Sequence, residues 1–467
     1  MNDKLAKALG YIDEKYIAAA AKRKNRRYFW IAPVAAVLAV VLLFNAFGSP
    51  FALTAKAVSL ASESRKMERP RNMNSENFDI WLDEEDARDK IVEMTMNPLV
   101  GFSSECSKNA ISGADSENRI WSPVNAYIAL AITAELTGGE SRQQVLEALG
   151  VNDIETLRTD ISALWEQVYQ DNGKEISVLA NSLWLDTEID YNQDVMDILG
   201  YNYYTSVYSG DLGSSKTNKD IAKWLNKQTS GLLDKQSGKT ELSPNSLMAI
   251  ASTVCFQSKW SDKFKSTNNT EGVFHANNGN ITCTFMNKEL SEMNYYWAED
   301  YGAVKIWLEE GSAMWFILPD EDKTVNDVLE SGDYMEMITH SDAFPKENRK
   351  WMKVNLSVPK FDISSSIDLE PALKEMGLSK IFEPLGNDFS PSVKSEIPVF
   401  LDSINQNSRV IIDEDGVKAA SYIILEFGAG SAEPPDEIID FILDRPFIFA
   451  ITTESIPLFI GTVNNPQ

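Results

Sequence analysis

A period-two pattern runs from Val417 to Phe427 and leads directly into a glycine-rich string. Alternation of this kind is typical of a strand with one buried face. The string, GAGSAEPP at residues 428–435, consists of small and flexible residues that proteases can reach and that have no means of packing. A strand pattern that ends in a cleavable tip predicts a loop that is able to become a strand. The expected inward face comprises Val417, Ala419, Ser421, Ile423, Leu425 and Phe427.

The composition excludes several classes of protein. The 467 residues carry 69 acidic and 43 basic side chains, a formal net charge of −26 at pH 7. Nucleic acid is disfavoured as a partner because another polyanion would be repelled. A hydrophobic content of 43% and eleven tryptophans are enough for a sizeable core, so the chain is not disordered as a whole.

Cysteine and histidine are too scarce for most catalytic or metal sites. Three scattered cysteines form neither a disulfide framework nor a CxxC site, and we expect buried free thiols. A Ser-His-Asp hydrolase or a zinc site would have to use His275 or His340. His275 is expected where a strand runs into an Asn/Gly turn, and His340 at the C-terminal end of a helix, where it complements the helix dipole. Neither has a chemical partner in the sequence, which predicts no metal, no cofactor and no enzyme.

The N-terminal region has the pattern of a membrane anchor. Residues 1–27 end in the basic cluster KRKNRR at 22–27, and residues 28–47 are uncharged and begin with three aromatic residues. Their length matches a hydrocarbon core of about 30 Å, and the basic flank predicts a cytoplasmic N-terminus. We therefore expect a cytoplasmic segment over 1–27, a transmembrane anchor over 28–48 and a spacer over 49–96. A cleaved signal peptide is the alternative, because small residues follow at 52–55.

Helical and strand patterns alternate over residues 97–467 and predict one mixed α and β domain. A helix over 123–137 is expected to begin at the cap Ser122, and a shorter one over 141–149 to begin at Ser141. Several strand-like runs are apolar on both faces, which favours central strands of a large covered sheet. These runs span residues 176–185, 248–256, 304–318, 354–358, 410–413 and 447–452.

Sequence blocks distributed over the same region resemble the serpin family in their order along the chain. They read NRIWSPVNAYIAL (118–130), LANSLWL (179–185), WLNKQTSGLL (224–233), STVCFQSKWSDKF (252–264), SAMWFILP (312–319), VPKFDI (358–363), LEPALKEMGLSKIF (369–382), NDFS (387–390), IIDEDGVKAAS (411–421), DRPFIFAI (444–451) and LFIGTVNNP (458–466). The resemblance covers residues 102–466. It implies a fold of three β-sheets and eight or nine helices, with an exposed reactive loop at about residues 414–438.

The resemblance also implies a mechanism. A target serine protease would cut the reactive loop and form an acyl-enzyme, and the cut loop would then insert into the large sheet and distort the attached protease. We expect a monomeric, extracellular suicide inhibitor of bacterial origin, tethered to the cell membrane or alternatively secreted. A non-inhibitory serpin that acts as a binding or scaffold protein is the alternative function.

Individual residues match the positions of the family's motifs. Trp260 falls where the family keeps a tryptophan at the top of the large sheet. Gln406 replaces a common histidine, so a pH response due to that histidine should be absent. A hydrogen-bonded cluster beneath the sheet is implied for Ser122, Asn125, Asn181 and Gln406. The hinge is implied to comprise Glu414, Gly416, Val417, Ala419, Ala420 and Ser421.

The bait residues, which are the residues around the bond that the target protease would cut, are small and uncharged. Family spacing places the scissile bond at Gly430-Ser431, within two residues either way, among Ala429, Gly430, Ser431 and Ala432. A trypsin-like protease has no Lys or Arg to bind there, so an elastase-like or subtilisin-like target is expected. Lys418 and Tyr422 depart from the family pattern, and both would point outward on insertion.

Overall fold

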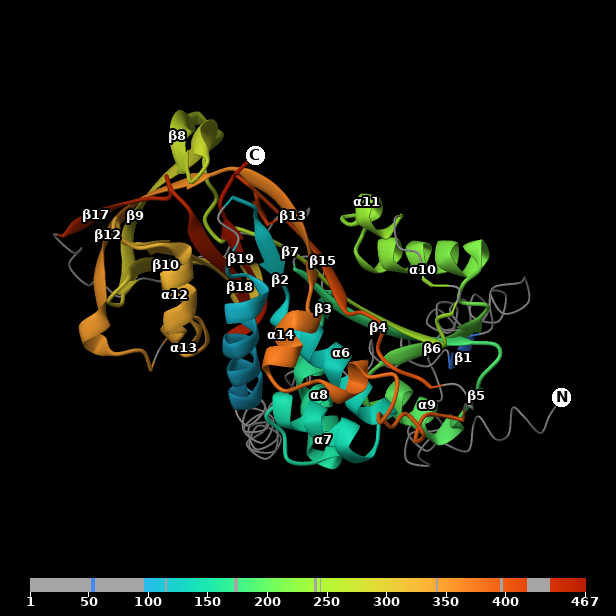
Figure 1. The fold of residues 1–467 in the computed structure, drawn as a ribbon. Coiled ribbons are helices and arrows are strands. Elements are labelled where there is room, and N and C mark those ends of the chain that lie inside the picture. Colours follow the sequence, from blue (N-terminus) through green and yellow to red (C-terminus); the bar gives the residue numbers. More distant parts are fainter. Residues whose placement is uncertain are drawn as a thin grey trace, which may run out of the picture. The chain divides into compact units, whose positions relative to one another are not determined.

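Two large sheets dominate the computed structural model (Figure 1). It describes residues 52–54, 96–113, 116–171, 175–238, 242–243, 245–341, 343–394, 398–417 and 437–467. The predictions for residues 1–48 and for 418–436, which include the anchor and the bait, lie outside these residues. Within the described part, no helix combines the length and the apolar character that crossing a bilayer requires.

The first sheet has eight strands. Its order is β1 (Ala52–Thr54), β6 (Thr205–Gly210), β4 (Ile176–Asp186), β7 (Met248–Lys259), β16 (Gly416–Val417), β15 (Asn405–Asp413) and β13 (Phe361–Asp368), and β3 (Gln170–Asp171) pairs with β4.

The second sheet has nine strands. Its order is β17 (Ile438–Ile442), β12 (Arg349–Pro359), β9 (Gly279–Trp297), β10 (Tyr301–Trp307), β11 (Ala313–Pro319), β18 (Phe447–Thr453), β19 (Ile456–Val463) and β2 (Arg119–Trp121), and β8 (Thr270–Ala276) pairs with β9. A short third ladder joins β5 (Asp190–Tyr191) to β14 (Val393–Lys394).

Helices cover both faces of the eight-stranded sheet. Figure 1 shows α10 and α11 on one side of β4 and β7, with α6, α8 and α9 on the other. Residues 96–110 are also helical. The α-helices are α6 (Pro123–Leu136), α7 (Gly139–Ala148), α8 (Ile154–Val168), α9 (Gln193–Asn202), α10 (Ser215–Gln228), α11 (Asp234–Ser237), α12 (Val325–Ser331), α13 (Asp333–Thr339) and α14 (Glu370–Glu375). Single 3₁₀ turns lie at Ser266–Asn268, Glu309–Gly311, Lys346–Asn348 and Lys380–Phe382.

The central helix α6 begins as its sequence predicts. The Ser122 side chain caps it by accepting a hydrogen bond from the backbone N–H of Asn125, and Pro123 occupies the first turn. The prediction for α7 is wrong by two residues. That helix begins at Gly139, and the Ser141 hydroxyl accepts a hydrogen bond from the Asp388 N–H instead of capping the helix.

The predicted single strand over 304–318 is wrong, because it is a hairpin of β10 and β11. The chain reverses at Glu310 and Gly311, whose φ values of 57° and 89° are left-handed. The other five strand-like runs lie within β4, β7, β12, β15 and β18.

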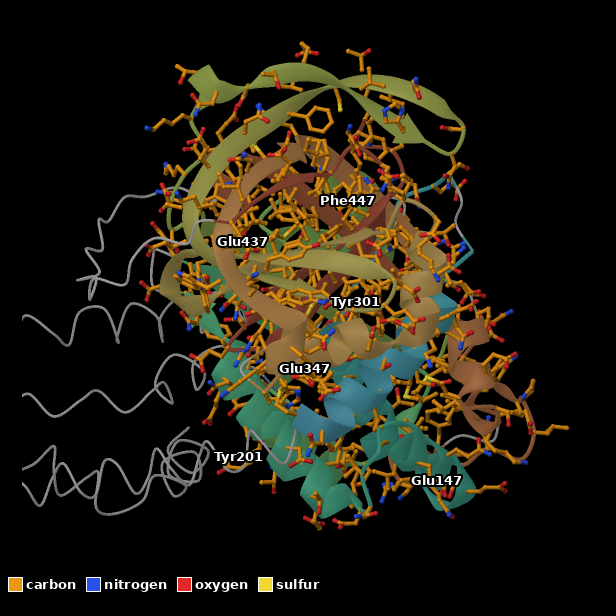
Figure 2. The ribbon with its side chains drawn as sticks, turned by 90° about the vertical axis from the view of Figure 1, so that its left-hand side faces the viewer. Glu147, Tyr201, Tyr301, Glu347, Glu437 and Phe447 are labelled. Carbon is orange, nitrogen blue, oxygen red and sulfur yellow. The ribbon has the colours of Figure 1, made fainter. Side chains whose placement is uncertain are left out.

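The core lies between the two sheets and their helices. Figure 2 shows Tyr301 and Phe447 inside the body, with Tyr201, Glu147 and Glu437 at its surface. The three cysteines are buried and free, which confirms that prediction. The mixed α and β architecture with three sheets is also confirmed.

Candidate functional site

An opening in the eight-stranded sheet lies between β7 and β15. Two residues, β16, enter it from one end. Val417 pairs with Ile412 of β15 and with Ser258 of β7, and Gly416 pairs with Asp413 and Lys259. Among the described residues, nothing else pairs with β7 and β15 on the sides that face each other. At this end the opening is therefore as wide as one strand. A strand that continued β16 would run antiparallel to both β7 and β15.

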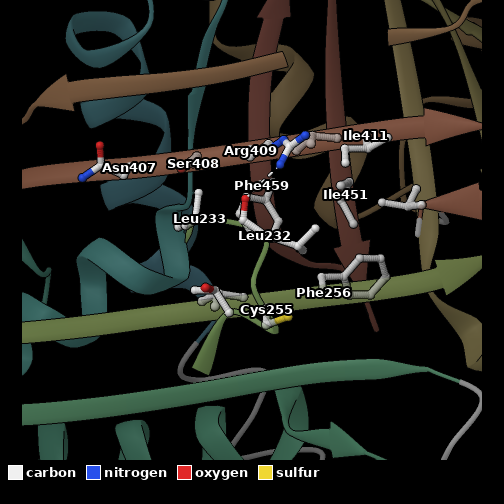
Figure 3. A pocket seen from close by; sticks show the side chains of 14 residues that line it. Leu232, Leu233, Cys255, Phe256, Asn407, Ser408, Arg409, Ile411, Ile451 and Phe459 are labelled. Atoms are coloured by element: carbon white, nitrogen blue, oxygen red, sulfur yellow. Dashed lines mark hydrogen bonds between the residues drawn. The ribbon is translucent and has the colours of Figure 1, made fainter. Parts of the chain in front are cut away.

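A cavity of about 40 Å³ occupies the opening (Figure 3). It is bounded by β7 at residues 254–256, by β15 at 407–411 and by Val417 at the inserted end. Ile451 and Phe459 of the nine-stranded sheet form its floor, and residues 229–233 lie over it. The cavity therefore lies in the gap between β7 and β15, beside the inserted end of β16.

A tight turn directs the chain from β15 into the opening. The Asp413 carboxylate accepts hydrogen bonds from the N–H groups of Asp415 and Gly416, at 2.9 and 3.3 Å. The buried Trp260 ring supports the same turn, because its Nε1 donates to the Asp413 carbonyl at 2.8 Å and its backbone N–H to the Asp415 carbonyl at 3.3 Å. Trp260 also packs edge-on against Phe264.

Charged contacts hold Glu414 and Asp415, the two residues at the tip of the turn. Glu414 bonds to Lys360, with Nζ–Oε2 at 2.8 Å, and accepts a hydrogen bond from Asn269. The Lys360 contact lowers the pKa of Glu414 below its ordinary value. The exposed Asp415 pairs with Lys263 at 2.7 Å.

Gly416 makes the close approach to β7 feasible. Its φ of +145° is one that residues with a side chain rarely adopt. A Cβ atom here would lie 2.5 Å from both Lys259 Cα and the Ser258 carbonyl oxygen. Both are backbone atoms of β7, so any side chain at this position would push the hinge out of the opening.

The four residues predicted as a cluster come together beneath the sheet, where the Asn125 N–H joins the Ser122 side of the cluster to the Asn181 side. The Gln406 side chain accepts from the Ser122 N–H at 2.7 Å and donates to the Ser122 carbonyl at 3.1 Å. Ser252, which sequence reasoning missed, joins the other two, because its hydroxyl lies within hydrogen-bond distance of both Asn125 Oδ1 and Asn181 Oδ1. Ser252 lies in β7 directly across from Asn181, and this pairing is visible only once the register of the two strands is known.

Glu175 is a second residue that sequence reasoning missed. This carboxyl group is fully buried, and the Ser312 hydroxyl donates to it at 2.8 Å. Burial raises the pKa of Glu175 to about 7, against the hydrogen bond from Ser312 that opposes the rise. Ser258 is also the β7 partner of Val417, so this carboxyl group lies one strand away from the inserted hinge.

The remaining predicted residues fall outside the described part of the chain. These are the hinge residues Ala419, Ala420 and Ser421 and the bait residues Ala429, Gly430, Ser431 and Ala432. The structure therefore brings together Glu414, Gly416, Val417 and Trp260 at the opening.

The contacts of the two histidines can be followed in the structure. The described residues contain no group of three or more His, Cys, Asp or Glu side chains that could hold a metal ion. His275 contacts Asn280, and His340 ends α13 as predicted and contacts Thr339. The opening instead provides a position at which one more strand would pair with β7 and β15.

Comparisons with known proteins agree with this geometry. A family model described as serpin (serine protease inhibitor) matches residues 99–466. Alpha-1-antiproteinase of Callosciurus caniceps is 29% identical over 380 residues, which cover 79% of this chain and 88% of the relative. Serpin-Z2A of Triticum aestivum is 27% identical over 387 residues, which cover 78% of this chain and 94% of the relative.

Solved structures show the same similarity. The thermophilic serpin tengpin in its native state is 25% identical with a TM-score of 0.70, and the match covers 90% of this chain and 100% of that one. Tengpin in its latent state is 26% identical with a TM-score of 0.65, over 78% of this chain and 96% of that one. Since the family model spans almost all described residues, the chain belongs to the serpin family, a family of serine protease inhibitors and not of enzymes.

Proposed function

We propose that this protein is a suicide inhibitor of serine proteases that works by inserting its cut reactive loop between β7 and β15. The observation that carries the proposal is the strand-wide opening with Gly416 and Val417 already paired on both sides. Cleavage after this hinge would free the following residues to continue the ladder that the hinge has begun.

The dimensions of the insertion suit the trapping of a protease. Residues 417–430 would form a strand of roughly 45 Å at about 3.3 Å per residue. A protease bound as an acyl-enzyme near residue 430 would be carried that far from its docking position. Because the active site of a serine protease depends on fixed geometry, such displacement would stop deacylation.

The bait favours a protease with a shallow apolar specificity pocket. Ala429, Gly430, Ser431 and Ala432 are all small and uncharged, and none of them can bind the buried Asp of a trypsin-like pocket. We therefore propose an elastase-like or subtilisin-like target.

The test is to incubate the full chain with pancreatic elastase or subtilisin and to boil the mixture for a denaturing gel. A covalent complex that survives boiling is expected for the native sequence. Replacing Val417 with Arg should convert at least ~90% of this complex to a clipped product, because an unpaired charge would be buried between Ser258 and Ile412.

The matched control is Val273→Arg, which places the same charge on an exposed valine of β8. This variant should form the complex as the native protein does. Clipping of the native protein without any complex would support instead a non-inhibitory serpin, and an equal yield from Val417→Arg would contradict insertion of the hinge.

We further propose that residues 28–48 tether the inhibitor to a bacterial cell membrane, with the serpin domain outside. The support is the uncharged run at 28–47 and the basic cluster before it. Cell fractionation should recover the full-length chain with the membranes, and external protease should digest the domain in intact cells. A released protein whose N-terminus lies near residue 56 would show that the segment is a cleaved signal instead.

A further inference from the structure

Two large apolar side chains lie exposed at one edge of the nine-stranded sheet. Trp351 of β12 is 48% exposed, and Ile438 of the edge strand β17 is 60% exposed. The same two strands bury Val354 and Phe441 completely or almost completely. Exposed apolar residues that lie close together on a protein surface indicate an interaction site. We call Trp351 and Ile438 the edge patch.

The register of the two strands places both residues on one face of the sheet. β12 and β17 run parallel, with Lys353 opposite Ile438. Trp351 precedes Lys353 by two residues, so its side chain points to the same side. On that side, Asn355 Nδ2 donates to Asp440 Oδ1 at 2.8 Å, one pair further along. Trp351 therefore lies diagonally across from Ile438.

Polar groups surround the edge patch and fix the start of β17. Lys350 Nζ lies 2.6 Å from both carboxylate oxygens of Glu437, and the Lys353 N–H donates to the Glu437 carbonyl at 3.0 Å. Asn294 of β9 lies opposite Trp351 on the other side of β12. An apolar centre with a polar rim is typical of protein–protein contacts, and tryptophan is among the residues that contribute most to their affinity.

The edge patch follows the bait closely along the chain. Five residues separate Ala432 from Glu437, and they span roughly 17 Å at most. A protease domain of roughly 250 residues has a radius of gyration of about 18 Å. A protease bound at the bait would therefore extend as far as β17. Because the edge patch comes after the scissile bond, it would contact the part of the protease surface that binds residues C-terminal to the cut.

We propose that Trp351 and Ile438 form an accessory docking surface for the target protease and increase the rate at which it binds the reactive loop. The inference rests on the proposed function and adds residues outside the loop that select the target. Ile438 belongs to the segment after the scissile bond, which stays in place while the acyl-enzyme moves with residue 430. The contact therefore exists only before the cut. It should speed the encounter without changing the later insertion.

The test measures the second-order rate constant for inhibition of pancreatic elastase and of subtilisin by the full chain. Trp351→Ser and Ile438→Ser should each lower this constant about 10-fold for at least one of the two proteases, because each removes a central apolar contact. Trp351→Phe should keep most of the native rate. The number of inhibitor molecules consumed for each trapped protease should stay at the native value in all three variants.

The matched control is Tyr201→Ser, which removes an aromatic side chain that is 76% exposed on α9. Figure 1 shows α9 on the opposite side of the molecule from β12 and β17. This variant should inhibit both proteases at the native rate, as expected for a residue outside the contact.

Three results would overturn the inference. Native rates for both serine variants with both proteases would show that the edge patch touches no protease, while the trapped complex would leave the proposed function standing. A native dimer that dissociates in Trp351→Ser, with unchanged inhibition rates, would assign the edge patch to a second copy of the chain. Absence of a trapped complex for the native protein would overturn the proposed function as well.

Discussion

Replacing Glu175 with Gln should raise the free energy of unfolding by about 3 kcal/mol at pH 8 and by almost nothing at pH 4. The pKa of Glu175 is raised to about 7 by burial, against an ordinary value of 4.5. This difference corresponds to about 3 kcal/mol at 1.36 kcal/mol for each pH unit. It is the penalty for carrying a charged carboxylate into the interior.

The sign of the effect follows from the two pKa values. Below pH 4.5 the carboxyl group is neutral in both the folded and the unfolded chain, so it does not lower stability. Between pH 4.5 and about 7 the unfolded chain loses the proton first, and the folded state becomes progressively less stable. Above that range the full penalty applies. Glutamine stays neutral throughout and can still accept the hydrogen bond from Ser312.

The measurement is urea unfolding of both proteins at pH 4, 6 and 8. Glu188→Gln is the matched control, because it removes one carboxylate from an exposed site and should change stability by less than about 0.5 kcal/mol at each pH. The charged groups nearest to Glu175 include Glu310 and Glu454, which raise its pKa further. A gain of the same size at pH 4 and pH 8 would contradict the assignment of the penalty to a buried charge.

Local signals in the sequence were sufficient for many elements of the fold. Ser122 and Pro123 marked the start of α6, because capping depends on adjacent residues. Gly416 was predicted as a hinge, and its φ of +145° with β7 backbone 2.5 Å from a Cβ position explains why glycine stands there. The sequence blocks that resemble the serpin family predicted how the strands and helices assemble into sheets, which local patterns could not predict.

The errors arose where contacts distant in sequence decide the structure. The hairpin at Glu310 and Gly311 was missed, since β10 and β11 are both apolar and their pairing joins residues on either side of the turn that local patterns do not reveal. Glu175 has no sequence signal of burial, because its surroundings come from residues distant in sequence, Ser312 and Ser258.

The melting temperature before and after cleavage of the reactive loop tests the central claim most directly. Residues 429–432 would be cut by a metalloprotease, which forms no acyl-enzyme and so cannot be trapped. Val417 is already buried in the intact protein, so insertion would newly bury Ile423, Leu425 and Phe427, for roughly 4–9 kcal/mol before ordering costs. The melting temperature should then rise by on the order of 20 °C.

Two comparisons make that measurement decisive. Val417→Arg, cut at the same bond, should show almost no rise, because the hinge can no longer lie between Ser258 and Ile412. A rise in the cut native protein alone is the result that the account predicts. A cut native protein that melts at the same temperature as the intact one would contradict it, since the opening between β7 and β15 would then accept no strand.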